Sequence, residues 1–256
     1  MIRYLKYFSL LLLMVSAALH AQAPASSSSD GQIAQVFNGP GISSLPDNPV
    51  EHARNTRPFH YGPFVSYGAG VGNRSQYHFV SAGVELGKAL TPVLPLGPLS
   101  GQFELAANVM PVWDGFTPAP HEENRRCTDP GGGTSPCVLP VGGGTFSGVS
   151  LTPVIFRWNF ANRAHRFQPW FQGAGGVIYT AHKFPPDVLV PHGASGGTSV
   201  WNFSPQGGMG FHWFQGARRS LDFQVNAVHI SSASLGDKNP GVNASFWVQA
   251  GYTFWR

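Results

Sequence analysis

Hydrophobic and polar residues alternate with a period of two over most of the chain after about residue 58. Such alternation, interrupted by turn residues, is typical of strands that present one face to an apolar phase and the other to a polar one. Eight segments follow the pattern, at approximately 59–71, 76–88, 101–111, 149–160, 167–179, 200–214, 220–232 and 242–254. We therefore predict an all-β protein with eight strands.

The two faces are clearest in the third and sixth segments. In the third, Phe103, Leu105, Ala107 and Val109 alternate with Gln102, Glu104, Ala106 and Asn108. In the sixth, Trp201, Phe203, Phe211 and Trp213 alternate with Asn202, Ser204, Gln206 and His212. Segments of this length and pattern predict an eight-stranded antiparallel transmembrane β-barrel of the outer membrane.

The interior of an eight-stranded barrel is narrow enough for side chains to fill it, so inward polar groups must satisfy one another. We expect a buried network that contains Glu85, Glu104, Arg157, His212 and Asp222. A structural filling of this kind is favoured over a pore.

The N-terminal residues predict export. Arg3 and Lys6 precede an apolar run at 8–19, and Ala21-Gln22-Ala23 supplies small residues for cleavage. We assign residues 1–23 to a signal peptide, 24–56, rich in Ser, Pro and Gly, to a flexible periplasmic linker, and 57–256 to the barrel. No run reaches the 18 or so apolar residues of a membrane-spanning helix.

Composition favours the membrane over the alternative of a soluble β-sandwich. Only 11% of the residues are charged and 13% are aromatic, against roughly 25% charged in soluble domains. The net charge of +4 comes without a Lys/Arg tract, so nucleic acid is not an expected partner. The expected partners are lipopolysaccharide, other outer-membrane lipids and the barrel-assembly machinery, and a homodimer stays open.

Connection lengths predict the orientation, because outer-membrane barrels have short periplasmic turns and longer outer loops. The connections at about 112–148 and 180–199 are long, and we expect them to face outward. The first contains Cys127 and Cys137, which we expect to form a disulfide, since two cysteines alone do not make a closed metal site. The charged stretch 121–126 is either a solvated loop or a contact for lipid phosphates.

The seventh segment ends in two polar residues on its apolar face. Leu221, Phe223, Val225 and Ala227 share this face with His229 and Ser231. His229 lies ten residues beyond Arg219 in the turn, or roughly 23 Å along the membrane normal, near the outer rim of the apolar band. A histidine two residues from a serine is a base within reach of a nucleophile. An ordinary interfacial His and Ser at a strand end is the alternative.

The longer string His229-Ile-Ser-Ser-Ala-Ser-Leu-Gly-Asp-Lys-Asn-Pro-Gly-Val-Asn243 resembles the lipid A 3-O-deacylase family of the PagL type. These proteins are eight-stranded outer-membrane barrels in which a His-x-Ser pair near the outward end of the seventh strand precedes an Asn-Pro-Gly turn. The resemblance implies that Ser231 attacks an acyl ester of lipid A while His229 accepts its proton.

Two positions depart from the family pattern. Ser232 stands where the family has asparagine, and Asn243 stands where it has the carboxylate that orients the histidine. Asp237 is the nearest carboxylate, although a turn residue is the simpler interpretation, and Ser232 could support an oxyanion hole. The leading hypothesis is a cofactor-free carboxylic ester hydrolase that removes a 3-O hydroxyacyl chain. The alternative is a structural, lipid-binding or adhesin-like barrel with a degenerate triad.

Overall fold

The computed structural model describes residues 48–185, 199–233 and 244–256, which belong to one compact unit, Pro46–Arg256. The expected signal peptide and residues 24–47 of the expected linker lie outside the described residues. The elements are α2 (Pro49–Thr56), β1 (Phe59–Gly70), the 3-10 turn η1 (Gly72–Arg74), β2 (His78–Ala89), the 3-10 turn η2 (Gly97–Leu99), β3 (Gly101–Phe116), β4 (His121–Thr128), β5 (Thr134–Val141), β6 (Thr145–Phe160), β7 (Phe167–Phe184), β8 (Ser199–Phe203), β9 (Gln206–Gly216), β10 (Arg219–His229) and β11 (Ala244–Trp255).

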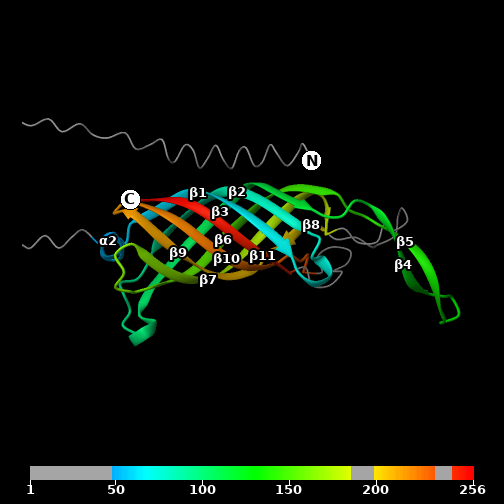
Figure 1. Cartoon of the computed structure of the whole chain (residues 1–256), viewed down its shortest axis with the longest axis horizontal. Helices are drawn as coiled ribbons and strands as arrows, with labels where there is room; N and C mark the ends of the chain where they lie inside the picture. Colours follow the sequence, from blue (N-terminus) through cyan, green and yellow to red (C-terminus); the bar gives the residue numbers. More distant parts are fainter. Residues whose placement is uncertain (1–47, 186–198, 234–243) are drawn as a thin grey trace, which may run out of the picture. The chain divides into compact units, whose positions relative to one another are not determined.

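The strands form a closed antiparallel barrel (Figure 1). Their order is β6-β3-β2-β1-β11-β10-β9-β7, and a further pairing of β6 with β7 closes the sheet. β8 and β9 both pair with β7 and together occupy one strand position. The predicted eight-stranded barrel is therefore confirmed.

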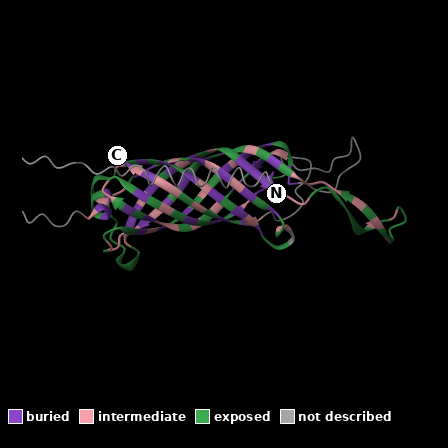
Figure 2. Ribbon diagram, turned by 45° about the horizontal axis from the view of Figure 1, so that its top comes forward, coloured by how far each residue is buried: buried purple, intermediate pink, exposed green. Residues whose placement is uncertain are grey.

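Burial alternates along the strands, as the diagonal bands of exposed and buried residues in Figure 2 show. In β3, Gln102, Glu104, Ala106 and Asn108 are buried, whereas Leu105 and Val109 are exposed. Large apolar side chains stand exposed on β2, β3, β6, β7, β9, β10 and β11, among them Leu86, Val109, Phe156, Phe171, Met209, Phe223 and Phe246. An exposed apolar surface of this extent suits contact with lipid.

Three strands extend further than the alternation indicated. β3 continues to Phe116, β6 begins at Thr145 and β7 continues to Phe184. The register of β3 with β6 shifts between Met110 and Trp113, which marks a bulge, and the period of two is lost there. Simple alternation therefore does not continue into the extensions of β3 and β6, and the pairing of β7 with β8 shifts likewise between Tyr179 and Phe184.

The segment expected as one strand at 200–214 is divided into β8 and β9 at Ser204-Pro205. Proline has no backbone N–H, so it cannot complete a ladder on both sides. The segment expected at 220–232 likewise ends as a regular strand at His229.

The connection after β3 contains a hairpin that the sequence pattern did not predict. β4 pairs with β5 along all eight residues of each strand, and the Cys127–Cys137 disulfide forms across it with a Cα–Cα distance of 5.7 Å. Thr117 donates a backbone hydrogen bond to Gly144, which links the hairpin to the ends of β3 and β6. We call this end of the barrel the hairpin end.

Residues 49–56 form helix α2, which corrects the expectation that they belong to a flexible linker. The Asn48 side chain accepts hydrogen bonds from the Val50 and Glu51 N–H groups, and Pro49 occupies the first turn. Val50 and Ala53 pack against Phe214 and Trp255 and close this end of the barrel, the helix end. Among the described residues, no helix is long and apolar enough to cross a membrane.

A network of charged groups lies in the interior above α2. Arg157 donates hydrogen bonds to Glu104 at 2.7 Å and to Glu85 at 2.8 Å. Glu104 also bonds to His60 at 3.0 Å, and Asp222 bonds to His212 at 2.8 Å. All five expected residues therefore take part in interior polar contacts, in two hydrogen-bonded sets, and His60 joins the set around Arg157.

Toward the hairpin end the interior contains a cluster of buried apolar side chains. Phe184 contacts the rings of Phe79, Trp113 and Phe146 at centroid distances of 6.0, 5.5 and 5.4 Å. The cluster also includes Tyr77, Ile178, Val228, Ile230 and Trp247. Cavities lined by interior residues of the barrel have volumes of about 30 and 20 Å³, room for one or two waters.

We expect Arg157→Met to lower the free energy of unfolding by about 3–5 kcal/mol, because two interior carboxylates lose their partner. Urea unfolding in lipid vesicles, followed by tryptophan fluorescence, measures the change. Arg125→Met, which breaks the exposed pair of Arg125 with Glu123, is the control and should cost less than ~1 kcal/mol. Equal losses in the two variants would contradict the assignment of Arg157 as a core residue.

Candidate active site

The end of β10 is anchored from inside the barrel. Val228 and Ile230 point into the aromatic cluster and are 7% and 1% exposed. Since side chains alternate across a strand, His229 is directed to the opposite, outer face, where it is half-buried. The apolar packing of its two neighbours thus determines where His229 stands.

The backbone on both sides of His229 is hydrogen-bonded. Its N–H donates to the carbonyl of Pro205 at 3.0 Å, and Ala244 lies opposite it on β11. Pro205 offers no N–H in return, so the regular ladder with β9 stops here. Pairing resumes one step further, where Ser231 and Phe203 exchange two backbone hydrogen bonds of 2.7 and 3.0 Å.

Ser231 opens a tight turn. Its Oγ accepts a hydrogen bond from the Ala233 N–H at 3.0 Å. Ala233 has a φ of +49°, a left-handed conformation that is uncommon for residues other than glycine. Such strain at a turn is common near functional sites. This backbone N–H is bonded to the serine oxygen itself, so it fixes the orientation of the Ser231 hydroxyl within the turn.

The exposure of Ser231 differs from the expectation. Leu221, Phe223 and Val225 on the same stripe are exposed as predicted, but Ser231 is only 9% exposed. The β-bridge between Ser231 and Phe203 holds this part of the chain against β8. The exposed apolar stripe of β10 therefore does not extend as far as Ser231. The serine is set into the wall, next to the half-buried histidine.

Ser232 is 3% exposed, and its Oγ has no hydrogen-bond partner among the described residues. Asp237 and Asn243 lie in the range 234–243, outside the described residues. Within the part of the chain that the structure describes, no carboxylate forms an ion pair with His229. The described residues also contain no group of three or more His, Cys, Asp and Glu that could hold a metal ion.

The barrel wall beside His229 is lined by small residues. Gly173 of β7 lies opposite Gly207 of β9, and Gly207 lies opposite Ala227 of β10. A Cβ atom added at Gly173 would meet nothing within 4 Å, and one at Gly207 would approach only a carbonyl at 3.7 Å. We call Gly173-Gly207-Ala227 the small-residue row. It ends at Phe246 of β11, which lies opposite Ala227.

Large aromatic side chains border the row. Phe203 lies opposite Ser231, and Trp201 packs on Tyr179 with ring centroids 4.8 Å apart. Phe246 is 58% exposed on the β11 side. The outer wall therefore has a shallow strip of small side chains between bulky aromatic rings. This strip begins next to His229.

A sequence model of a known family matches residues 118–253, just over half of the chain, and is described as lipid A 3-O-deacylase (PagL). The chain belongs to the PagL family. The match confirms the resemblance drawn from the string after His229, and it includes both His229 and Ser231.

Solved structures with similar architecture include outer-membrane barrels of more than one kind. The outer membrane enzyme PagL has a TM-score of 0.42 and 15% identity, covering 75% of this chain and 99% of its own. Neisserial surface protein A has 0.46 and 10%, covering 77% and 97%. The N-terminal barrel of Pseudomonas aeruginosa OprF has 0.36 and 9%, covering 76% and 96%. No curated protein sequence matches the chain.

Proposed function

We propose that this PagL-family protein is an esterase that removes a 3-O-linked hydroxyacyl chain from lipid A, with Ser231 as nucleophile and His229 as general base. The observation that carries the proposal is the placement of these two residues at the end of β10, beside a lipid-facing wall. The orientation that we infer puts the hairpin end outward, so that the pair faces the leaflet that contains lipopolysaccharide.

The reaction would follow serine acyl transfer. His229 takes the proton of Ser231 Oγ as this oxygen attacks the ester carbonyl carbon. Collapse of the tetrahedral intermediate releases the lipid A hydroxyl, which receives the proton from His229. Water, deprotonated by His229, then hydrolyses the acyl-enzyme and frees the hydroxy fatty acid. Side chains and water suffice for these steps.

The negative charge that develops on the carbonyl oxygen needs a donor. The Ala233 N–H now donates to Ser231 Oγ at 3.0 Å, and it would serve the substrate oxygen only if this bond is released when the serine attacks. Ser232, with its buried and unpartnered hydroxyl, is a second candidate. Both donors come from the turn that follows the nucleophile.

We assign the third position of the site, which orients the histidine, to Asn243. Ala244 lies opposite His229, so Asn243 precedes the residue that faces the histidine. An asparagine oxygen can orient an imidazole ring but supplies no negative charge to stabilise the imidazolium. The same replacement costs about 10⁴-fold in a serine protease. Asp237 is the other candidate for this role.

The small-residue row suits an extended acyl chain. Gly173, Gly207 and Ala227 leave space on the wall, and Phe203 and Phe246 provide apolar surface at its borders. A chain lying along this row would keep its ester near Ser231 while its methylene groups stay in the apolar layer. The ester would thus react at the same outer wall of the barrel that contacts the membrane lipids.

Ser231→Ala and His229→Asn should each abolish the loss of one hydroxyacyl chain from lipid A, as measured by mass spectrometry after incubation with the purified protein. Ser147→Ala and His78→Asn are matched controls, because both residues are exposed on the barrel and lie outside the site. If the wild type leaves lipid A intact, the alternative of a structural, lipid-binding or adhesin-like barrel is favoured.

Asn243→Glu should raise the rate of deacylation, by up to ~10⁴-fold if a missing carboxylate limits the native enzyme. Asp237→Asn should leave the rate unchanged when residue 243 is the orienting partner. A large loss in Asp237→Asn, with no gain in Asn243→Glu, would instead assign the acid role to Asp237. Initial rates on purified lipid A distinguish these results.

Gly207→Phe should slow deacylation of lipid A by roughly tenfold or more, because the ring occupies the row that we assign to the acyl chain. Hydrolysis of a short, water-soluble ester should change little. Ala107→Phe places the same ring on β3, four strand positions from β10, and is the control. Equal slowing in both variants would show that the row has no special role.

A further inference from the structure

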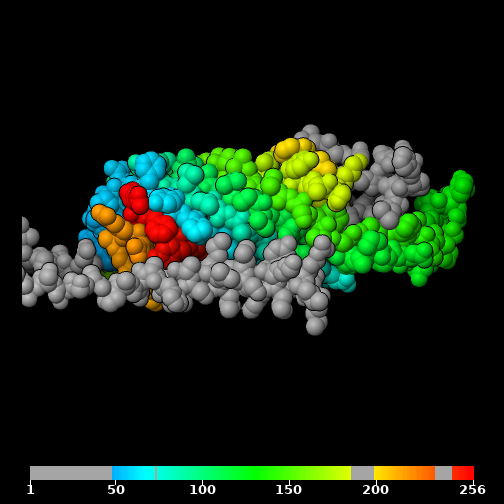
Figure 3. Space-filling view, turned by 90° about the horizontal axis from the view of Figure 1, so that it is seen from above, coloured from blue at the N-terminus to red at the C-terminus, as the bar shows by residue number. Residues whose placement is uncertain are grey.

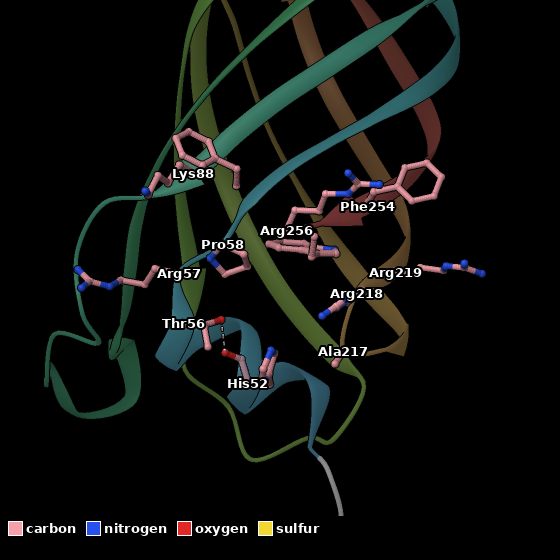
Figure 4. A pocket seen from close by; sticks show the side chains of 12 residues that line it. His52, Thr56, Arg57, Pro58, Lys88, Ala217, Arg218, Arg219, Phe254 and Arg256 are labelled. Atoms are coloured by element: carbon pink, nitrogen blue, oxygen red, sulfur yellow. Dashed lines mark hydrogen bonds between the residues drawn. The ribbon is translucent and has the colours of Figure 1, made fainter.

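A basic cleft of about 920 Å³ opens at the helix end of the barrel (Figure 4). Arg219, at the start of β10, lines it, whereas His229 of the candidate active site stands at the other end of this strand. Five cationic side chains line it, and they come from four parts of the chain. Arg57 follows α2, Lys88 lies next to the end of β2, Arg218 lies in the β9–β10 turn, Arg219 begins β10, and Arg256 follows β11. No acidic side chain is among the lining residues.

The cations of this cleft are unpaired. Among the described residues, none of the five lies within ion-pair distance of a carboxylate. Arg57, Arg218, Arg219 and Arg256 are exposed, and Lys88 is half-buried. Five cationic side chains around one cleft repel one another, so the cleft is a favourable place for an anion.

Backbone hydrogen bonds join the chain segments that carry several of these residues. The Trp255 N–H donates to the Arg218 carbonyl at 2.9 Å, and the Arg256 N–H donates to the Phe59 carbonyl at 2.7 Å. The blue, orange and red segments, which contain the first described residues, the β9–β10 connection and the end of β11, accordingly lie at one end of the surface (Figure 3). The cation cluster is therefore a product of barrel closure rather than of neighbouring residues in the sequence.

Aromatic residues at the edge of the apolar wall adjoin the cleft. Lys88 Nζ lies 4.1 Å from the ring centroid of Phe59, which is 58% exposed. The Arg256 guanidinium lies 5.8 Å from the centroid of Tyr61, and Tyr61 stacks on Phe254 at 5.6 Å. Aromatic belts of this kind mark the level of lipid headgroups in membrane barrels.

We propose that the basic cleft binds the phosphate headgroup of an anionic phospholipid in the leaflet at the helix end. Arginine offers paired donors that match phosphate oxygens, and the neighbouring aromatic surface would contact the first methylene groups of the acyl chains. A soluble anion would use only the cations, whereas a phospholipid uses the cations and the lipid-facing rings. The proposal is independent of the chemistry at Ser231.

Native mass spectrometry of the full-length protein in detergent tests the proposal, with phosphatidylglycerol, phosphatidylethanolamine and inorganic phosphate as probes. Phosphatidylglycerol should bind at least tenfold more tightly than phosphatidylethanolamine. The double variant Arg218→Gln/Arg219→Gln should weaken its binding roughly tenfold to thirtyfold, because each cation near a membrane surface contributes separately. Arg125→Gln/Arg126→Gln removes the same charge from the exposed hairpin and should change nothing.

Three results would overturn the proposal: equal binding of the two phospholipids, equal weakening in both double variants, or displacement of phosphatidylglycerol by millimolar inorganic phosphate. The last result would identify a site for soluble anions. Heat-modifiable migration on gels checks that each variant retains the folded barrel, and the exposed positions of all four arginines make misfolding unexpected.

Discussion

The enclosed guanidinium of Arg157 imposes the strongest constraint on this barrel. A charge inside a narrow protein interior is tolerated only when partners surround it. Glu85 of β2 and Glu104 of β3 supply those partners, and Gln172 of β7 adds a further acceptor. Because these groups come from different strands, the network specifies the register of four neighbouring positions in the sheet.

Apolar packing takes over on either side of this polar layer. Val50, Ala53, Phe214 and Trp255 fill the helix end, and the aromatic cluster around Phe184 fills the hairpin end. The second cluster matters for chemistry, since Val228 and Ile230 belong to it and flank His229 in the chain. The position of His229 on the outer wall is thus determined by the packing of its two neighbours in the interior cluster.

Much of the fold could be predicted from the sequence because a barrel strand has a face for lipid and a face for the interior. The network around Arg157 was predictable for the same reason, since charged residues at inward positions have no other partners. Helix α2 was missed, although Asn48-Pro49 is a helix-start signal, because eight residues give too short a pattern. The β4–β5 hairpin was missed because its alternation buries no core.

The candidate site was predictable in part. The positions of His229 and Ser231 at the end of the seventh barrel strand followed from alternation and from the string that continues to Asn243. The burial of Ser231 did not, because it depends on pairing with Phe203 across the break at Pro205. Contacts between residues that are distant in sequence produce no periodic pattern in the sequence. The left-handed turn at Ala233 likewise has no sequence signal, because alanine rarely adopts this conformation.

The filled interior has a kinetic consequence. Among the described residues, packed side chains fill both ends of the barrel, and the cavities between them hold only one or two waters. Lipids meet the outer wall by lateral diffusion in two dimensions within their own leaflet. The frequency of these encounters therefore depends on the number of lipid molecules per unit membrane area, and dilution of the surrounding solution does not alter it.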